Sequence, residues 1–287
     1  PRHVARTAPK ILLRPSSPIG VFLRIYLTYL TWRARSDTLR VWPQYIATEL
    51  RMLPLFFAAI RRMCRQDIEG TDMARKIAYQ GEPGANSHIA CNNAFPDMEP
   101  MPCATFEDCF SAVEEDRAAL AMIPLENTIA GRVGDIHYLL PRTSLNIISE
   151  YYLPIRHQLM GLHGATLSDI ESARSHIMGL GQCRNFLREH GISLITAADT
   201  AGAAREVAEA GDLTIAAIAP RLAADVYDLD ILAEDIEDDA HNTTRFIVMA
   251  REPADLDAEE GPAKTAFLFQ VRNIPAALFK VMGGFAT

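Results

Sequence analysis

Apolar residues recur in short, regularly spaced runs from residue 76 onward. Runs that are β-branched or alternate with polar residues predict strands, and runs with apolar positions three and four residues apart predict helices. Strands are expected at Lys76–Gln80, Ala118–Pro124, in two pieces of Leu145–Leu162 around Pro154, and at Ile192–Ala197, Leu213–Ala219, Thr244–Ala250 and Lys264–Arg272. Helices are expected at Ala85–Ala94, Phe106–Glu115, Val133–Leu140, Leu167–Arg174, Gln182–His190, Ala201–Ala210, Arg221–Tyr227 and Pro275–Phe285. This alternation predicts an α/β fold with a mostly parallel sheet, and about 180 residues of it suit two small lobes.

Residues 1–72 differ in composition from the rest of the chain. They hold twelve Lys and Arg against five Asp and Glu, a balance of +7, whereas the other residues hold sixteen against thirty-one, a balance of −15. We favour the interpretation that they are a translated upstream region, because Met73 stands just before the first clear strand. An organellar targeting segment, indicated by the absence of Asp and Glu before Asp37, and a structural extension are the alternatives.

Composition excludes several classes of partner. The acidic balance after residue 72 argues against nucleic acid, because a phosphate backbone requires a clustered basic face. The apolar stretches Ile25–Trp32 and Leu53–Ile60 are shorter than the roughly 18–20 residues of a membrane span, so no membrane partner is expected. The five cysteines form no CxxC pair, and no His cluster has metal-ligand spacing. We therefore expect free thiols in a reducing cytoplasm and no metal.

The pattern divides the chain into four parts. These are a basic extension (1–72), an α/β domain (73–251), a linker rich in Pro, Asp and Glu (252–263), and a last strand and helix (264–287). A lone strand and helix cannot bury a core of their own. We expect residues 264–287 to begin a domain whose remainder lies beyond Thr287.

The first of four segments with candidate chemistry is a turn between a strand and a helix. It contains Gln80, Gly81 and Gly84. In an open α/β sheet ligands bind at such strand ends, and the backbone N–H groups of the turn can face an anion. The alternative is that the two glycines serve only the turn.

The second and third segments place amide and hydroxyl side chains before predicted helices. Asn127 and Thr128 follow a strand that is predicted to end at Pro124, and they either bond a ligand or cap the next helix. In the third segment Gln182 can orient a substrate through two hydrogen bonds. His176, alone there, is more often a structural histidine than a catalyst.

The fourth segment, His241–Phe246, leads into a strand. Arg245 offers a planar fork of N–H donors that suits a carboxylate, and a neighbouring Thr hydroxyl can donate a proton. The alternative is an ordinary strand entry with a surface Arg. The acidic run Glu234–Asp239 before it is expected to be a solvated edge.

Taken together, the segments YQGEPGANS, IPLENTIAGRV, SHIMGLGQC and HNTTRF resemble, in order and spacing, the motifs of the prephenate dehydratase family. The resemblance covers about Lys76 to Ala250. Lys264–Ala266 and Val271–Leu278 resemble the opening of the ACT regulatory domain that follows the catalytic part in this family. One departure is Ile177-Met178, where Pro-Gln is common after Ser-His.

The resemblance implies a fold and a set of site residues. The fold is a two-lobed α/β catalytic domain similar to a periplasmic binding protein, followed by the start of a ferredoxin-like ACT domain. The resemblance assigns catalysis to Thr244, Asn127 and Gln182. It assigns substrate binding to Gln80, Gly81, Gly84, Thr128, Gly131, His176, Arg245 and Phe246.

The reaction implied is the conversion of prephenate to phenylpyruvate, CO2 and water in L-phenylalanine biosynthesis. Aromatisation of the ring drives it, so no cofactor is expected. In the family, phenylalanine binds the ACT domain at a dimer interface as a feedback inhibitor. The partial motif here is Asn273, Pro275, Ala276, Ala277 and Leu278, with Ala276 where Gly is usual. The second motif, Glu-Ser-Arg-Pro, does not occur, so we expect feedback to be lost and the homodimer or larger homo-oligomer to belong to a longer form.

Three other functions remain open. Arogenate is an alternative to prephenate as the substrate, since the two differ only by an amine and a keto group. A non-catalytic two-lobed binding or sensor protein for small anions has the same lobes but does not explain Thr244, Asn127 and Gln182 together. An N-terminal chorismate mutase is disfavoured, because residues 1–72 lack its helical pattern and its paired basic and acidic residues.

Overall fold

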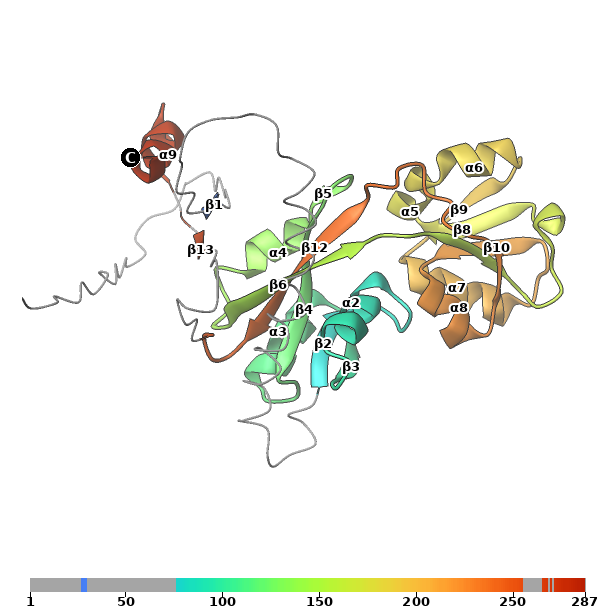
Figure 1. The fold of residues 1–287 in the computed structure, drawn as a ribbon, viewed down its shortest axis with the longest axis horizontal. Helices are drawn as coiled ribbons and strands as arrows, with labels where there is room; N and C mark the ends of the chain where they lie inside the picture. Colours follow the sequence, from blue (N-terminus) through green and yellow to red (C-terminus); the bar gives the residue numbers. More distant parts are fainter. Residues whose placement is uncertain (1–26, 30–75, 255–264, 268, 270, 287) are drawn as a thin grey trace, which may run out of the picture. The chain divides into compact units, whose positions relative to one another are not determined.

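The computed structural model describes residues 27–29, 76–254, 265–267, 269 and 271–286 (Figure 1). By its internal contacts the chain divides into two units, residues 34–261 and residues 1–33 with 262–287. The larger unit carries two separate sheets, and each forms the centre of one lobe.

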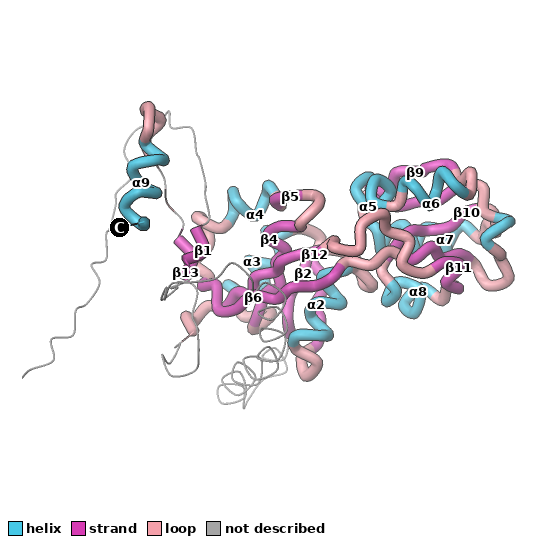
Figure 2. Tube along the Cα trace, turned by 45° about the horizontal axis from the view of Figure 1, so that its top comes forward, coloured by secondary structure: helices cyan, strands magenta, loops and turns pink. Residues whose placement is uncertain are grey.

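The first lobe is built on a sheet whose strands alternate in direction only at one side. Its order is β3 (Glu99–Cys103), β2 (Lys76–Gln80), β4 (Leu120–Asn127), β12 (Thr243–Ala250), β6 (Asn146–Pro154), with β5 (Gly131–Arg132) paired to β4. β3, β2 and β4 are parallel, whereas β12 is antiparallel to both β4 and β6. Figure 2 shows β12 and β6 side by side in this sheet.

The second lobe repeats this mixed pattern. Its order is β11 (Asp230–Ala233), β7 (Gln158–Gly161), β10 (Ile215–Ala219), β8 (Ser172–His176), β9 (Ser193–Ala197). β10, β8 and β9 are parallel, and β7 is antiparallel to β10 and β11. The predicted two-lobed α/β fold is confirmed, but the mostly parallel sheet is wrong. The chain crosses between the lobes twice, and in each sheet one strand next to a crossing, β12 or β7, runs antiparallel to both of its neighbours.

Helices cover the sheets and complete the cores. In the first lobe they are α2 (Asn86–Ala94), α3 (Phe106–Glu114) and α4 (Gly134–Leu139), and in the second η2 (Leu167–Asp169), α5 (Ile177–Gln182), α6 (Arg184–Glu189), α7 (Thr200–Ala210) and α8 (Arg221–Tyr227). Successive residues of β10 enter two different cores: Ile218 packs with Leu180 and Leu187, whereas Ala217 packs with Val207 and Ala223. Because side chains alternate along a strand, helices lie on both faces of this sheet.

Some predicted elements are corrected by the structure. Leu167–Arg174 is not a helix, since its single 3₁₀ turn ends at Asp169 and β8 follows in the middle of the sheet. The predicted helix Gln182–His190 is present as the shorter α6, and α5, which ends just before it at Gln182, was not predicted. β4 passes through Pro124 to Asn127, with a register shift there against β12. Such a bulge accommodates a proline, which has no N–H to donate.

The smaller unit consists of short elements. β1 (Leu27–Tyr29) pairs antiparallel with β13 (Thr265–Phe267), and α9 spans Ala277–Ala286. The predicted strand Lys264–Arg272 is therefore shorter, with residues 264, 268 and 270 outside the described residues. The ACT domain and its phenylalanine site stay predictions. Among the residues described, no helix has both the length and the apolar character that crossing a bilayer requires.

Candidate active site

The chain segments that cross between the lobes are bonded to each other. One joins β6 to β7, and the other joins β11 to β12. The backbone N–H of Ile155 donates to the carbonyl of Asn242 over 2.8 Å, and that of Ile236 donates to the carbonyl of His157 over 2.9 Å. These bonds bring polar side chains of both lobes to one place.

Asn127, at the end of β4, has a fixed side-chain orientation. Its Oδ1 accepts from the backbone N–H groups of Ile129 and Ala130 at 2.9 and 2.8 Å. Because a backbone N–H can only donate, Oδ1 must face these groups and Nδ2 must face away. Nδ2 donates to Oδ1 of Asn242 over 2.7 Å and to Oγ1 of Thr244 over 2.9 Å. Thr244 therefore receives a hydrogen bond from Asn127.

The same argument fixes the orientation of the polar side chains that continue into the second lobe. Since Oδ1 of Asn242 accepts from Asn127, its Nδ2 is the donor to Oε1 of Gln182, at 3.0 Å. Oε1 of Gln182 also lies 2.8 Å from Nε2 of His157. A carbonyl oxygen can only accept, so the histidine donates from Nε2. We call these five residues (Asn127, Thr244, Asn242, Gln182 and His157) the amide network.

Two donor groups of the amide network remain available. The hydroxyl hydrogen of Thr244 and the side-chain N–H2 of Gln182 have no acceptor among the residues that the structure describes. Asn242 is fully buried and Thr244 is 9% exposed, whereas Gln182 is partly exposed. The network can therefore present two oriented, uncharged donors to a ligand.

The surroundings of His157 favour the neutral form of its imidazole. Burial lowers the pKa of its imidazole below the ordinary value, although the hydrogen bond to Gln182 and the charge of Glu237 act in the opposite direction. Its Nδ1 is buried without a hydrogen-bond partner. An added proton on Nδ1 would have no acceptor, so the form with hydrogen on Nε2 alone is favoured.

Arg245 lies on the opposite face of β12 from Thr244, because side chains alternate along a strand. Its guanidinium donates to Glu126 over 2.9 Å and to both oxygens of Glu150 over 2.8 and 3.1 Å. Burial alone would lower its pKa, but the bonds to Glu150 and Glu126 outweigh this and raise it. The hydroxyl of Tyr152 donates to Glu150 over 2.8 Å. We call these four residues the Arg245 cluster.

Three other residues that the resemblance assigns to substrate have structural contacts. Phe246 is 1% exposed and packs in the core of the first lobe. The Thr128 hydroxyl donates to the carbonyl of His241 and accepts from the N–H of Thr243, both at 3.0 Å. Gly131 is exposed, with φ of +80°, and pairs with Asn127.

The turn after β2 contacts the second lobe. Gly84 has φ of +90°, and a Cβ placed on it would lie 2.8 Å from Cα of Ala223 in α8. The hydroxyl of Tyr227 donates to the carbonyl of Pro83 over 2.9 Å. The N–H of Gly81 donates to the carbonyl of Cys103, and that of Gly84 donates to Nδ1 of His88. These two N–H groups are thus used inside the protein, unlike the expected anion-facing arrangement.

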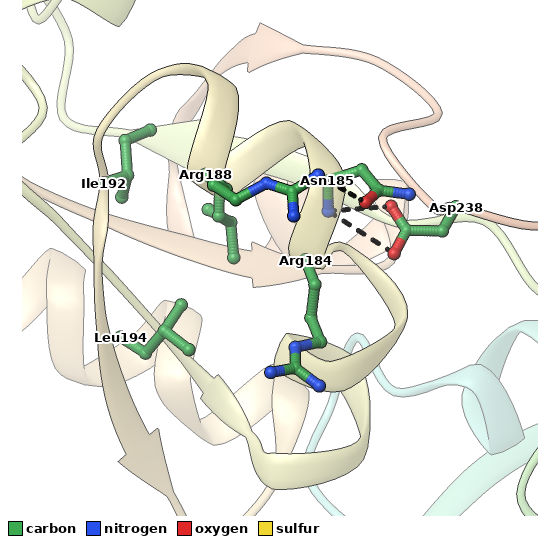
Figure 3. Close-up of a pocket in the computed structure, with 7 residues that line it drawn as sticks. Arg184, Asn185, Arg188, Ile192, Leu194 and Asp238 are labelled. Atoms are coloured by element: carbon green, nitrogen blue, oxygen red, sulfur yellow. Dashed lines mark hydrogen bonds between the residues drawn. The ribbon is translucent and has the colours of Figure 1, made fainter.

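His176 and one surface hollow lie outside the network. Nδ1 of His176 caps α5 by accepting from the N–H of Met178 over 3.3 Å. A hollow of about 540 Å³ beside α6 and β9 is shown in Figure 3. It is lined by Arg184, Asn185, Leu187, Arg188, Ile192, Leu194 and Asp238. None of these was predicted to bind substrate, and the free donors of the amide network are not among them.

Sequence reasoning missed two members of the network. Asn242 stands within the HNTTRF segment, where only the following residues were given a role. His157 stands in the apolar run Leu145–Leu162. A histidine within a buried apolar run was the available signal, since buried polar groups need partners.

Comparisons with known proteins agree on one family. The model of the family described as "Prephenate dehydratase" matches residues 77–254, more than half of the chain. A Komagataeibacter europaeus protein named "Bifunctional N-acyl-homoserine lactone acylase/prephenate dehydratase" is 44% identical over 213 residues, covering 74% of this chain and 76% of that protein. An Arabidopsis thaliana protein named "Arogenate dehydratase/prephenate dehydratase 1, chloroplastic" is 42% identical over 218 residues, covering 76% of this chain but only 55% of that protein.

Solved structures have the same fold. One described as "GqqA- a novel type of quorum quenching acylases" has a TM-score of 0.68 at 43% identity, covering 74% of this chain and 77% of that one. The Arthrobacter aurescens prephenate dehydratase in complex with L-Phe has a TM-score of 0.64 at 27% identity, covering 74% and 72%. With the family match over both lobes, these findings show that the chain belongs to the prephenate dehydratase family.

Proposed function

We propose that this protein catalyses the decarboxylating dehydration of prephenate to phenylpyruvate in L-phenylalanine biosynthesis. The observation that carries the proposal is the hydroxyl of Thr244. It accepts from Asn127, so its hydrogen is free to donate to a ligand. Membership of a dehydratase family supports this use of it.

In the proposed reaction the bond from the ring to its carboxylate breaks, and CO2 leaves. The electron pair of that bond enters the ring, the bond from the ring to the hydroxyl breaks, and the hydroxyl takes up a proton that comes from solvent to leave as water. Thr244 donates a hydrogen bond to this departing oxygen. A positioned donor of this kind contributes on the order of 10²- to 10⁴-fold in rate. Holding a single substrate in its reactive conformation adds to this.

The substrate's two carboxylates need donors other than Arg245. That guanidinium is committed to Glu126 and Glu150 on the other face of the strand. The free N–H2 of Gln182 is a suitable donor. Binding roles for Gln80, Gly81, Gly84 and His176 remain predictions.

The test replaces Thr244 in the purified protein. Thr244→Ala should lower kcat by about 10²- to 10⁴-fold with little change in KM, because the lost bond forms mainly in the transition state. Thr244→Ser keeps the hydroxyl and should keep most of kcat. Thr243→Ala, the preceding residue of the same strand, is the matched control. Phenylpyruvate is read by its absorbance in alkali, and a wild-type kcat in Thr244→Ala contradicts the assignment.

Arogenate is the second candidate substrate. Several relatives at 38–42% identity carry arogenate dehydratase in their names. The same protein should be assayed with prephenate and arogenate in parallel, with phenylalanine measured as the product of the latter. Binding of either compound without turnover would favour the non-catalytic sensor instead.

A further inference from the structure

His157 is a buried group for which the proposed reaction has no direct use. It stands between β6 and β7 and is 2% exposed. Its Nε2 meets Oε1 of Gln182, which also accepts from Asn242. Gln182 therefore receives two hydrogen bonds on the same oxygen.

Two donors on one oxygen determine which way the amide of Gln182 faces. If the amide turned by half a rotation, its N–H2 would meet the donors of His157 and Asn242, and all of these groups would lose their bonds. Asn242 cannot adapt by turning, because its own Oδ1 accepts from Asn127. The observed orientation leaves the N–H2 of Gln182 free.

The backbone that carries the His157 ring is held by hydrogen bonds on both sides. Its backbone N–H donates to Glu237 over 3.0 Å, and its carbonyl accepts from Ile236. Glu237 forms an ion pair with Arg156. The charge of Glu237 also acts on the imidazole of His157. The backbone of His157 is thus anchored on both sides, and the ring, 2% exposed with the rest of the residue, bonds Gln182 through Nε2.

We propose that His157 is a positioning residue: with hydrogen on Nε2 it holds the Oε1 of Gln182, so that the N–H2 of Gln182 points to the substrate. The inference rests on the proposed function for its kinetic consequence. The bond donated from Nε2 and the unpartnered Nδ1 both point to this tautomer.

Two substitutions distinguish a His157 that positions Gln182 from one that only fills space. His157→Leu fills the site without a donor, whereas His157→Gln keeps an N–H donor of similar reach. We expect kcat for prephenate to fall about 10- to 100-fold in His157→Leu, as for other misplaced catalytic groups, and to stay within about fivefold of wild type in His157→Gln. Equal losses in both variants, or a wild-type kcat in His157→Leu, would overturn the proposal. Circular dichroism and thermal melting establish that both variants are folded.

A second measurement does not depend on activity. Nitrogen-15 NMR of the imidazole should show the proton on Nε2, and the side-chain amide signals of Gln182 should move in His157→Leu but little in His157→Gln. A proton on Nδ1 instead, or unchanged Gln182 signals, would refute the inference. If the wild-type protein does not turn over prephenate or arogenate, the proposed function fails, and the NMR result still decides the role of His157.

Discussion

Thr244 and Arg245 are neighbours in β12, yet their two faces of the strand carry different kinds of polar group. On the Thr244 face, the amide network consists of uncharged groups whose bonds run in set directions and end in two free donors. On the Arg245 face, one guanidinium meets two carboxylates. An uncharged network with spare donors suits binding and catalysis, whereas a charged cluster that satisfies itself suits stability.

The charges lead to the same conclusion. Arg245, Glu126 and Glu150 together carry a net charge of −1, so the Arg245 cluster would repel a substrate with two carboxylates. The expectation that Arg245 holds a substrate carboxylate is therefore not supported by its contacts. Variants of the amide network should affect catalysis more than stability, and variants of the Arg245 cluster should do the reverse.

Apart from the variants of Thr244 itself, the largest effect is expected from Asn127→Asp. The new carboxylate has no N–H to donate, so the Thr244 hydroxyl would donate to it and no longer to the substrate. We expect kcat to fall by about 10²- to 10³-fold, similar to the loss of one oriented donor in other active sites. Asn146→Asp, which alters a partly exposed asparagine bonded to the carbonyl of Arg251, is the control. A kcat within about fivefold of wild type would remove the distinction between the two faces.

The next effect is on stability, in Arg245→Met. Two carboxylates lose the guanidinium, and since the Glu126 side chain is 47% exposed and Glu150 keeps the hydrogen bond from Tyr152, we expect a loss of about 2 kcal/mol rather than the larger cost of a fully buried pair. Tm should fall by about 4–8 °C, while kcat of the folded protein stays within about fivefold. Glu150→Gln should lower the free energy of unfolding less in the Arg245→Met protein than in wild type, because the two residues are coupled. A large loss of kcat at unchanged Tm would mean that the Arg245 face serves catalysis rather than stability.

A smaller effect is expected from Thr128→Val. The variant loses a hydroxyl that bonds His241 and Thr243, which should cost about 1 kcal/mol, and Thr128→Ser should restore it. Denaturant unfolding measures this change, and kcat should be unaffected. If kcat falls 100-fold in Thr128→Val only, Thr128 binds substrate, as the resemblance implied.

The smallest effect is a dependence on pH. The pKa of His157 is lowered in the folded state, so the unfolded chain binds more protons once the pH falls below the ordinary value of 6.5. The stability from neutral His157 is thus complete above pH 6.5 and is lost as the pH falls toward the folded pKa. His88, whose pKa is also lowered, contributes to the same slope. The free energy of unfolding should therefore fall less steeply in His157→Gln than in wild type, and parallel curves would contradict the prediction.

Local patterns predicted many elements well. The bounds of β2 and α8 agree with the sequence prediction, because each is a compact apolar pattern bounded by turn residues. β8 was missed because Ser172–His176 has no β-branched residue, and its strand is stabilised by pairing with β9 and β10. β3 was missed because Pro100 and Pro102 disfavour strands, although an edge strand tolerates them.

The acidic run Glu234–Asp239 also contains a feature that local patterns did not predict. Glu234–Asp239 was expected to be a solvated edge, and most of it is exposed. The side chain of Glu237, however, is only 2% exposed and pairs with Arg156. No local feature distinguishes Glu237 from its acidic neighbours, since its partner comes from the other crossing segment.

The sequence by itself determined the succession of strands and helices, the four motifs and hence the family. It also determined that Thr244 and Arg245 point to opposite faces once β12 is a strand, because side chains alternate. Only the tertiary structure decided what each face meets. Asn127 and Asn242 are 115 residues apart, and Arg245 and Glu150 are 95 apart. A hydrogen bond depends on position within tenths of an ångström, and packing of both lobes sets that position.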